Sequence, residues 1–255
     1  MKNLFDLTGR VAIVTGASSG LGVDFAKALA NQGANLALIA RREDKLKEVQ
    51  KEIEKLGVTC RYYVCDVMKT DQIQDTVERV EKDFGRIDIL VNNAGLGLVD
   101  AAEKTTDEMW RTMVDTNLNG VYFFAREVGK VMLKQKYGRI INIGSIHSVV
   151  SMKEMPVTAY CATKGGVLTL TKALASEWAK EGITVNAIGP GYFALGMAEG
   201  VVADPEFAKI IEFMCPMGRP GRSGELDTTV LYLASDASTY ITGQMIIVDG
   251  GWTSI

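Results

Sequence analysis

The chain has 255 residues, of which 47% are apolar and 23% charged, with 26 glycines and 5 prolines. This balance excludes a disordered or fibrous protein, and the length suits one α/β domain. The net charge of −3 offers no basic field of the kind that nucleic-acid binding requires. We therefore expect a single globular domain over residues 1–255 that does not bind nucleic acid.

Short apolar runs alternate with longer amphipathic stretches, a pattern typical of βα units around a parallel sheet. Strands are predicted at Val11–Thr15, Asn35–Ala40, Cys60–Cys65, Ile87–Val91, Gly138–Gly144, Ile183–Ala187 and Met245–Val248. Helices are predicted at Leu21–Asn31, Arg42–Leu56, Asp71–Phe84, Thr106–Gln135 and Ala159–Lys180, with C-terminal stops at Gly33, Gly57, Gly138 and Gly182. We expect a doubly wound, Rossmann-type α/β fold with a seven-stranded parallel sheet and helices on both faces.

The segment from residue 190 to about residue 222 has the least regular pattern and holds four of the five prolines. An irregular insertion near the end of an α/β sheet is most often a lid or a substrate loop. We expect this segment to be the substrate loop.

The cysteines indicate whether the protein binds a metal, and the first residues and the apolar runs indicate whether it enters a membrane or is secreted. Cys60, Cys65, Cys161 and Cys215 form no CxxC pair, and the chain has one histidine. A Cys/His zinc site would need more ligands, so no metal is expected. The first residues lack the apolar core of a signal peptide, and no apolar run approaches the roughly 20 residues of a membrane span. We expect reduced thiols, no membrane partner and a cytoplasmic protein.

A glycine-rich turn follows the first predicted strand and opens directly into a helix. It reads Thr15-Gly16-Ala17-Ser18-Ser19-Gly20-Leu21-Gly22. Its glycines let the backbone turn tightly and approach a pyrophosphate, whose charge is met by free N–H groups at the helix start. The turn predicts a dinucleotide site with contacts at Gly16, Ser18, Ser19, Gly20, Leu21 and Gly22.

Over essentially the whole chain, this turn and the motifs after it resemble the short-chain dehydrogenase/reductase family. The matching features are TGASSGLG at 15–22, Asp66, NNAG at 92–95, Asn117, Ser145, Tyr160-x-x-x-Lys164, Pro190-Gly191 and ITGQMIIVDGG at 241–251. Residues 140–193 are most similar to gluconate 5-dehydrogenases and 3-oxoacyl-carrier-protein reductases. The resemblance of the closing segment implies a homotetramer.

The end of the second predicted strand bears on the choice of nicotinamide cofactor. NAD-using relatives place an acidic side chain there, which bonds the ribose hydroxyls and repels a 2′-phosphate. This chain has Ala40, followed by Arg41 and Arg42. A guanidinium forms forked, charge-assisted bonds to a phosphate, which favours NADP(H) over NAD(H). Alternatively, the two arginines only solvate the start of the next helix.

The resemblance implies further cofactor contacts along the sheet edge. Asp66 would bond the adenine amino group beside Val67, although an aspartate here is equally typical of a turn or a helix N-cap. The remaining contacts that the resemblance implies are Asn93, Ala94, Gly95, Tyr160, Lys164, Pro190, Gly191 and Phe193.

Tyr160 and Lys164 stand four residues apart, so a helix places both side chains on one face. A phenol titrates at about 10, and proton transfer near neutral pH therefore requires that its anion be stabilised. We expect Lys164 to lower the pKa of Tyr160 and to hold the nicotinamide ribose.

Two further polar residues complete the expected catalytic set. Ser145 follows the fifth strand and would hydrogen-bond the substrate oxygen. Because its spacing to Tyr160 is slightly longer than is usual in the family, Ser148 is the alternative serine. By resemblance, Asn117 supports a water chain that leads protons from Lys164 to solvent.

The segment after Pro190 departs from the family pattern. Relatives usually carry a threonine that holds the nicotinamide carboxamide, and this chain has Leu195 in its place, followed by Gly196, which we expect to loosen the loop. Leu195 suggests a pocket for bulky, apolar ketones. The candidate substrate contacts are Leu96, His147, Met155, Tyr192 and Leu195, with the lone His147 expected to be a pocket or surface residue rather than the base.

Together, these features predict an NADP(H)-dependent oxidoreductase that interconverts a ketone and a secondary alcohol, with Tyr160 as general acid/base. The segment 96–102 after NNAG is apolar and acidic, with no cation for a carboxylate. The predicted substrate is therefore a neutral prochiral ketone or ketoester. The alternatives are a gluconate 5-dehydrogenase-like enzyme acting on a sugar acid, a non-catalytic nucleotide-binding protein, and a sugar-nucleotide epimerase, which would need a larger C-terminal part.

Overall fold

The computed structural model describes residues 3–153 and 155–255. Its centre is a seven-stranded parallel sheet in the order β3-β2-β1-β4-β5-β6-β7. The strands are β1 (Val11–Thr15), β2 (Asn35–Ala40), β3 (Cys60–Val64), β4 (Ile89–Asn92), β5 (Gly138–Ile143), β6 (Ile183–Pro190) and β7 (Met245–Val248). The predicted doubly wound fold is confirmed, with all seven strands in their expected places.

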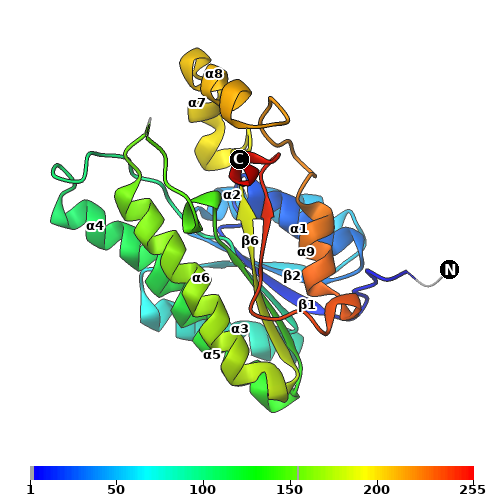
Figure 1. Ribbon diagram of the computed structural model, residues 1–255. Coiled ribbons are helices and arrows are strands. Elements are labelled where there is room, and N and C mark those ends of the chain that lie inside the picture. Colours follow the sequence, from blue (N-terminus) through cyan, green and yellow to red (C-terminus); the bar gives the residue numbers. More distant parts are fainter. Residues whose placement is uncertain (1–2, 154) are drawn as a thin grey trace.

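Helices cover both faces of the sheet (Figure 1). One face packs against α1 (Leu21–Asn31), α2 (Glu43–Glu54) and α9 (Asp227–Ala234). The other packs against α3 (Thr70–Phe84), α5 (Gly120–Gln135) and α6 (Thr158–Trp178). The central strands are therefore buried from both sides, which explains why every residue of β1 and β4 is buried and why neither strand alternates between apolar and polar residues.

The stretch predicted as one helix over Thr106–Gln135 is divided into three pieces. It forms α4 (Asp107–Val114), a five-residue π-helical turn over Asp115–Asn119, and then α5. A π turn inserts extra backbone into a helix, so side chains after it face a different direction. Here the turn buries both Thr116 and Asn117 on the inner side. The prediction of one regular helix was wrong at this point.

One of the four predicted helix stops was also wrong. Gly33, Gly57 and Gly182 have positive φ angles, as a helix stop requires, but Gly138 does not. The residue that ends α5 is Lys136, which itself adopts the left-handed conformation with φ 55°. Gly138 instead begins β5, where a side chain would collide with Met132.

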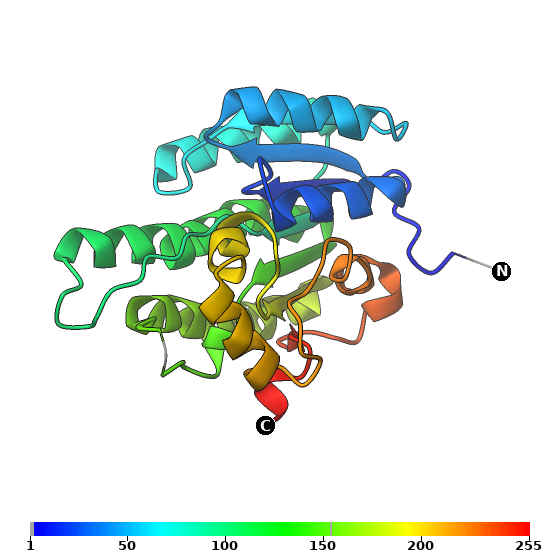
Figure 2. The same cartoon turned by 90° about the horizontal axis from the view of Figure 1, so that it is seen from above.

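The segment around residues 190–222 contains two helices that the sequence analysis did not predict, α7 (Glu199–Val202) and α8 (Pro205–Met214). The side chain of Asp204 caps α8 by accepting hydrogen bonds from the N–H groups of Glu206 and Phe207. Phe207 packs in a separate apolar cluster with Trp252, near the C-terminus. Viewed from above, α7 and α8 lie over the middle of the molecule (Figure 2). Because α7 and α8 lie over the rest of the molecule in this view, we call residues 190–222 the cover segment.

The position of a ligand site follows from the strand order. The chain runs outward from β1 through β2 to β3, and then returns to build the other half of the sheet from β4. Loops from adjacent strands diverge at this reversal, which leaves a crevice at the carboxyl ends of β1 and β4.

Candidate active site

A cleft of about 400 Å³ opens at the carboxyl ends of the strands. Its walls come from the residues that follow β1, β2, β3, β4, β5 and β6, together with α6 and the cover segment. Every predicted site residue lines this cleft except Gly22 and Asn117. Lining residues that the sequence analysis missed include Val99, Thr116, Val157, Met197 and Val201.

The glycine-rich turn has the close backbone approaches that a phosphate cradle requires. Gly16 has φ 66°, and a Cβ there would lie 2.8 Å from Nδ2 of Asn93. A Cβ on Gly22 would collide with the carbonyl oxygen of Gly16, so Gly22 shapes the turn from behind without lining the cleft. The first N–H groups of α1 have no partners within the helix and are available to an anion.

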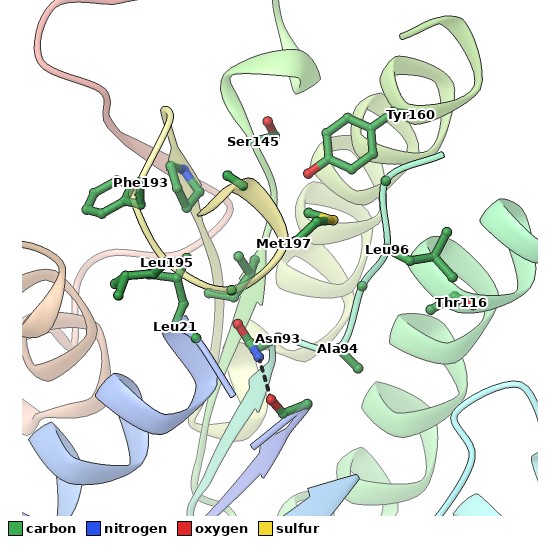
Figure 3. A pocket seen from close by; sticks show the side chains of 18 of the residues that line it. Leu21, Asn93, Ala94, Leu96, Thr116, Ser145, Tyr160, Phe193, Leu195 and Met197 are labelled. Carbon is green, nitrogen blue, oxygen red and sulfur yellow. Dashed lines mark hydrogen bonds between the residues drawn. The ribbon is translucent and has the colours of Figure 1, made fainter. Parts of the chain in front are cut away.

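The cover segment approaches the glycine-rich turn closely where Gly196 lies against Gly20. A Cβ on Gly20 would lie 3.0 Å from Cα of Gly196, and Gly196 has φ 56°. Gly196 therefore does more than loosen the loop, because it permits two backbones to meet where a side chain would not fit. Leu195 lies beside Leu21 at this end of the cleft, on the opposite side from Tyr160 (Figure 3).

Both arginines after β2 line the cleft next to the turn. Nη2 of Arg42 donates to the hydroxyl oxygens of Ser18 at 3.0 Å and Ser19 at 2.7 Å. Asp66 also lines the cleft, and its Oδ1 accepts from the N–H of Met68 at 3.0 Å. The interpretation of Asp66 as a turn residue is confirmed, and its contact with the adenine amino group stays a prediction for a residue that lines the cleft.

Ser145, not Ser148, occupies the expected position of the catalytic serine. Ser145 lines the cleft on the same side as Tyr160 (Figure 3). The Oγ of Ser148 accepts from the N–H of Ser145 at 3.2 Å. Ser148 thus fixes the backbone of Ser145 and does not line the cleft.

Lys164 lies behind Tyr160, with its Nζ 5.6 Å from the centre of the tyrosine ring. This Nζ donates to the carbonyl oxygen of Ile143 at 2.7 Å, and burial lowers the pKa of Lys164 to about 8. Burial raises the pKa of Tyr160 to about 12, and the nearby hydroxyl of Ser145 opposes that rise. The expected lowering of the tyrosine pKa by Lys164 is not found here, because the ammonium faces a carbonyl oxygen and not the phenol.

Asn117 is fully buried and holds the backbone of Leu96. Its Oδ1 accepts from the N–H of Leu96 at 2.9 Å, and its Nδ2 donates to the carbonyl oxygen of Leu96 at 2.8 Å. A longer contact of 3.3 Å joins Nδ2 to Oγ1 of Thr163. In this structure Asn117 positions the loop after β4, and the π-helical turn directs its side chain inward.

One buried hydroxyl group without a partner bears on whether a nicotinamide dinucleotide fits this cleft. Oγ1 of Thr116 is buried without a hydrogen-bond partner, and Thr116 lines the cleft beside Ala94 (Figure 3). A buried hydroxyl without a partner costs free energy, which a polar ligand would recover. With the glycine cradle and the arginines, this unpaired hydroxyl fits an extended, phosphorylated ligand.

The wall beyond Tyr160 is mainly apolar. Its apolar lining residues are Leu96, Val99, Met155, Val157, Met197 and Val201. His147 and Tyr192 bring polar atoms to it, with Nε2 of His147 lying 3.0 Å from Oη of Tyr192. As expected, His147 is a pocket residue, and it is not in the position of the base.

Residues 3–153 and 155–255 contain neither a cluster of metal-binding side chains nor a membrane-spanning helix. Within them, no group of three or more His, Cys, Asp or Glu side chains could hold a metal ion. No helix of the same residues is long and apolar enough to span a bilayer. The four cysteines are free thiols, as expected.

Comparison with known proteins agrees with the geometry of the cleft. A family model described as enoyl-(acyl carrier protein) reductase matches residues 16–253. Gluconate 5-dehydrogenase of Gluconobacter oxydans is 39% identical, covering 98% of this chain and 97% of that protein, and sorbose reductase of Candida albicans is 40% identical, covering 98% and 89%. The crystal structure of a gluconate 5-dehydrogenase from Burkholderia cenocepacia with NADP and tartrate superposes with a TM-score of 0.95 at 35% identity, covering 99% and 98%. The chain belongs to the short-chain dehydrogenase/reductase family and is an oxidoreductase.

Proposed function

We propose that this oxidoreductase transfers hydride between NADP(H) and a neutral substrate, interconverting a ketone and a secondary alcohol. The observation that carries the proposal is the position of Tyr160. Tyr160 and Ser145 lie on one side of a cleft that the glycine-rich turn also lines (Figure 3). A proton donor and a dinucleotide cradle thus share one cavity.

In the proposed reaction the nicotinamide supplies or accepts the hydride, and the protein handles the proton. During reduction, Tyr160 and Ser145 donate hydrogen bonds to the carbonyl oxygen and stabilise the charge that develops there. The tyrosine proton then passes to that oxygen as the C–H bond forms. During oxidation the deprotonated oxygen of Tyr160 accepts the alcohol proton. The ammonium of Lys164, which faces the carbonyl oxygen of Ile143, would hold the nicotinamide ribose.

The preference for NADP(H) rests on the residues after β2. Ala40 offers no carboxylate to a ribose, and Arg41 and Arg42 both line the cleft there. Arg42 is already bonded to Ser18 and Ser19, so its charge is fixed over the phosphate turn. Arg41 is exposed and can turn toward a 2′-phosphate. The Burkholderia relative was crystallised with NADP.

The proposal of a neutral substrate rests on where the charges lie. Within the described residues, the charged side chains that line the cleft are Arg41, Arg42, Asp66 and Lys164. The first three follow β2 or β3, at the adenosine end, and Lys164 faces the carbonyl of Ile143. A carboxylate beside Tyr160 would thus lose hydration without gaining a cation.

A sugar acid remains the second candidate because two of the relatives are named gluconate 5-dehydrogenases. Absorbance at the NADPH band separates the candidates. We expect NADPH to be consumed with neutral ketones, NADP to be reduced with neutral secondary alcohols, and gluconate to be a poor substrate. No turnover of any neutral ketone or alcohol with either cofactor would refute the proposal.

Two further proposals concern the rest of the chain. We propose that the whole chain acts as one domain, in which the cover segment at 190–222 closes over the substrate. We also propose a homotetramer, because β7 is an edge strand whose four residues are all partly exposed. Sedimentation velocity at micromolar concentration tests the second proposal, and a monomer would contradict it.

A further inference from the structure

His147 and Tyr192 form a hydrogen-bonded pair beside the catalytic tyrosine. Nδ1 of His147 lies 3.2 Å from the carbonyl oxygen of Val150, and its Nε2 lies 3.0 Å from Oη of Tyr192. The imidazole ring stands edge-on to Tyr160 with ring centres 5.9 Å apart. It is 6% exposed and thus almost removed from water. The pair belongs to the wall against which a substrate of Tyr160 must rest.

The contacts of the imidazole fix the direction of the hydrogen bonds. A carbonyl oxygen can only accept, so Nδ1 of His147 must carry a proton. Burial keeps the pKa of His147 below its ordinary value, so the ring is neutral at neutral pH and Nε2 is unprotonated. The hydroxyl of Tyr192 therefore donates its proton to Nε2.

This direction decides what Tyr192 can offer to a ligand. With its proton engaged by His147, the phenol oxygen of Tyr192, a residue that lines the cleft, keeps only an acceptor role. The sulfur of Met152, 3.3 Å from this oxygen, is only a weak alternative acceptor for the same proton. A ligand hydroxyl can donate to the phenol oxygen, whereas a carboxylate or an ether can only accept and finds no donor.

The surroundings make this acceptor selective. Apart from Ser145, Tyr160 and the pair itself, the described side chains that line this wall are mainly apolar. A donor placed there has few other partners, and a buried hydroxyl left unpaired costs free energy. The aromatic contacts of Tyr192 with Phe207 and Trp252, at ring-centre distances of 4.9 and 5.2 Å, hold the phenol in place.

We propose that Tyr192, positioned by His147, recognises a second hydroxyl group close to the reacting carbon, so that the substrates are neutral hydroxyketones and polyols. This inference rests on the proposed function and narrows its substrate class. It also separates this pocket from one for bulky apolar ketones, since Leu195 lies at the other end of the cleft (Figure 3).

The test compares two ketones of equal size with NADPH, hydroxyacetone and 2-butanone, which differ by a hydroxyl in place of a methyl group. We expect kcat/KM to be at least about tenfold higher for hydroxyacetone, the worth of one net hydrogen bond. Tyr192→Phe keeps the ring and removes the acceptor. It should abolish this preference by raising KM for hydroxyacetone, so that the two ketones then give similar values of kcat/KM.

Two further variants separate recognition from packing. His147→Phe removes the group that positions the phenol, and should reduce the preference as Tyr192→Phe does. Tyr63→Phe is the matched control, because it removes a buried tyrosine hydroxyl that bonds Asp83 at 2.8 Å outside the cleft. The control should keep the wild-type preference.

The possible results separate a failure of the inference about Tyr192 from a failure of the proposed function. If the wild type reduces both ketones equally, or if Tyr192→Phe slows both by the same factor, Tyr192 has only a packing role and this inference is overturned while the proposed function stands. If the wild type reduces neither these two ketones nor any ketone of the wider panel, the proposed function fails and the inference with it.

Discussion

The two ends of the cleft are built by different means. The cofactor end consists largely of backbone, drawn close by Gly16 and Gly22 and supported by Asn93, whose Nδ2 donates to the carbonyl oxygen of Thr15 at 3.0 Å. The substrate end consists of side chains from distant segments, such as His147, Tyr192 and Trp252. The first arrangement recognises what every dinucleotide shares. The second is free to vary, since replacing one of its side chains leaves the sheet and the turn intact.

The largest expected effect is at the point where the two ends meet. Tyr160→Phe removes the proton donor but leaves the cradle intact. We expect kcat to fall by about 10²- to 10⁴-fold, the usual worth of a positioned acid or base, with the Kd of NADPH unchanged. Steady-state rates and NADPH fluorescence titration measure the two quantities. Tyr240→Phe, at a fully exposed tyrosine, should behave as wild type. A Tyr160→Phe enzyme that retains more than a tenth of the wild-type kcat would contradict the role of Tyr160.

A second effect concerns the stability cost of the buried ammonium. The pKa of Lys164 is lowered to about 8 from 10.5, so the charged form disfavours folding below pH 8, and this cost disappears as the pH rises to 10.5. Lys164→Met should therefore abolish turnover and stabilise the fold at pH 7 by up to about 3 kcal/mol, less the lost bond to Ile143.

Urea unfolding at pH 7 and at pH 10 tests this sign. The stability gain of Lys164→Met should shrink at the higher pH, because wild-type Lys164 is then largely neutral in the folded protein. An equal gain at both pH values would show that packing, and not charge, is responsible.

A third effect concerns the close backbone contacts of the glycine-rich turn, which leave no room for a side chain at Gly22. A methyl group on Gly22 would collide with the carbonyl oxygen of Gly16. Gly22→Ala should thus destabilise the fold by about 1–3 kcal/mol, as overpacking does, and weaken NADPH binding more than about tenfold. Gly200→Ala in α7 is the control, since nothing lies within 4 Å of its added methyl group. Equal behaviour of the two variants in unfolding and in titration would show that the turn tolerates side chains.

The smallest effect concerns the choice between the two cofactors. We expect Arg41→Ala to raise KM for NADPH by more than about tenfold, or about 1.4 kcal/mol, with KM for NADH nearly unchanged. Arg111→Ala, at an exposed arginine paired with Asp107 on α4, should change neither value. If the wild type uses both cofactors equally well, Arg41 does not read the 2′-phosphate.

The contrast between the cofactor end and the substrate end of the cleft also explains how much of the structure could be predicted from the sequence. Seven strands and the cofactor end were predictable, because apolar periodicity and glycine spacing are local signals. The π-helical turn at Asp115–Asn119 was not, since its cause is tertiary. Gly120 packs so closely on Val67 that a Cβ would lie 2.9 Å from the carbonyl oxygen of Val67. Helix α8 could have been found, because Asp204 followed by Pro205 is a typical helix start.

The substrate end shows what local signals cannot supply. His147 and Tyr192 were both expected to line the pocket, but their hydrogen bond joins residues 45 positions apart. Nor could the sequence reveal that Lys164 faces the carbonyl of Ile143, because that depends on the packing of α6 against β5. Residue types could be inferred from motifs, whereas the directions of their hydrogen bonds could not.

The contact between Gly20 and Gly196 has a consequence for the order of events during turnover. A Cβ on Gly20 would lie 3.0 Å from Cα of Gly196, so the glycine-rich turn and the segment at 190–222 approach each other closely, and we expect them to move together. Ligands that share one movable segment are thermodynamically linked, and each changes the affinity of the other by the same factor. If the proposed function is correct, we expect a bound dinucleotide to set the shape of the chamber that the second reactant enters, with the cofactor first in and last out.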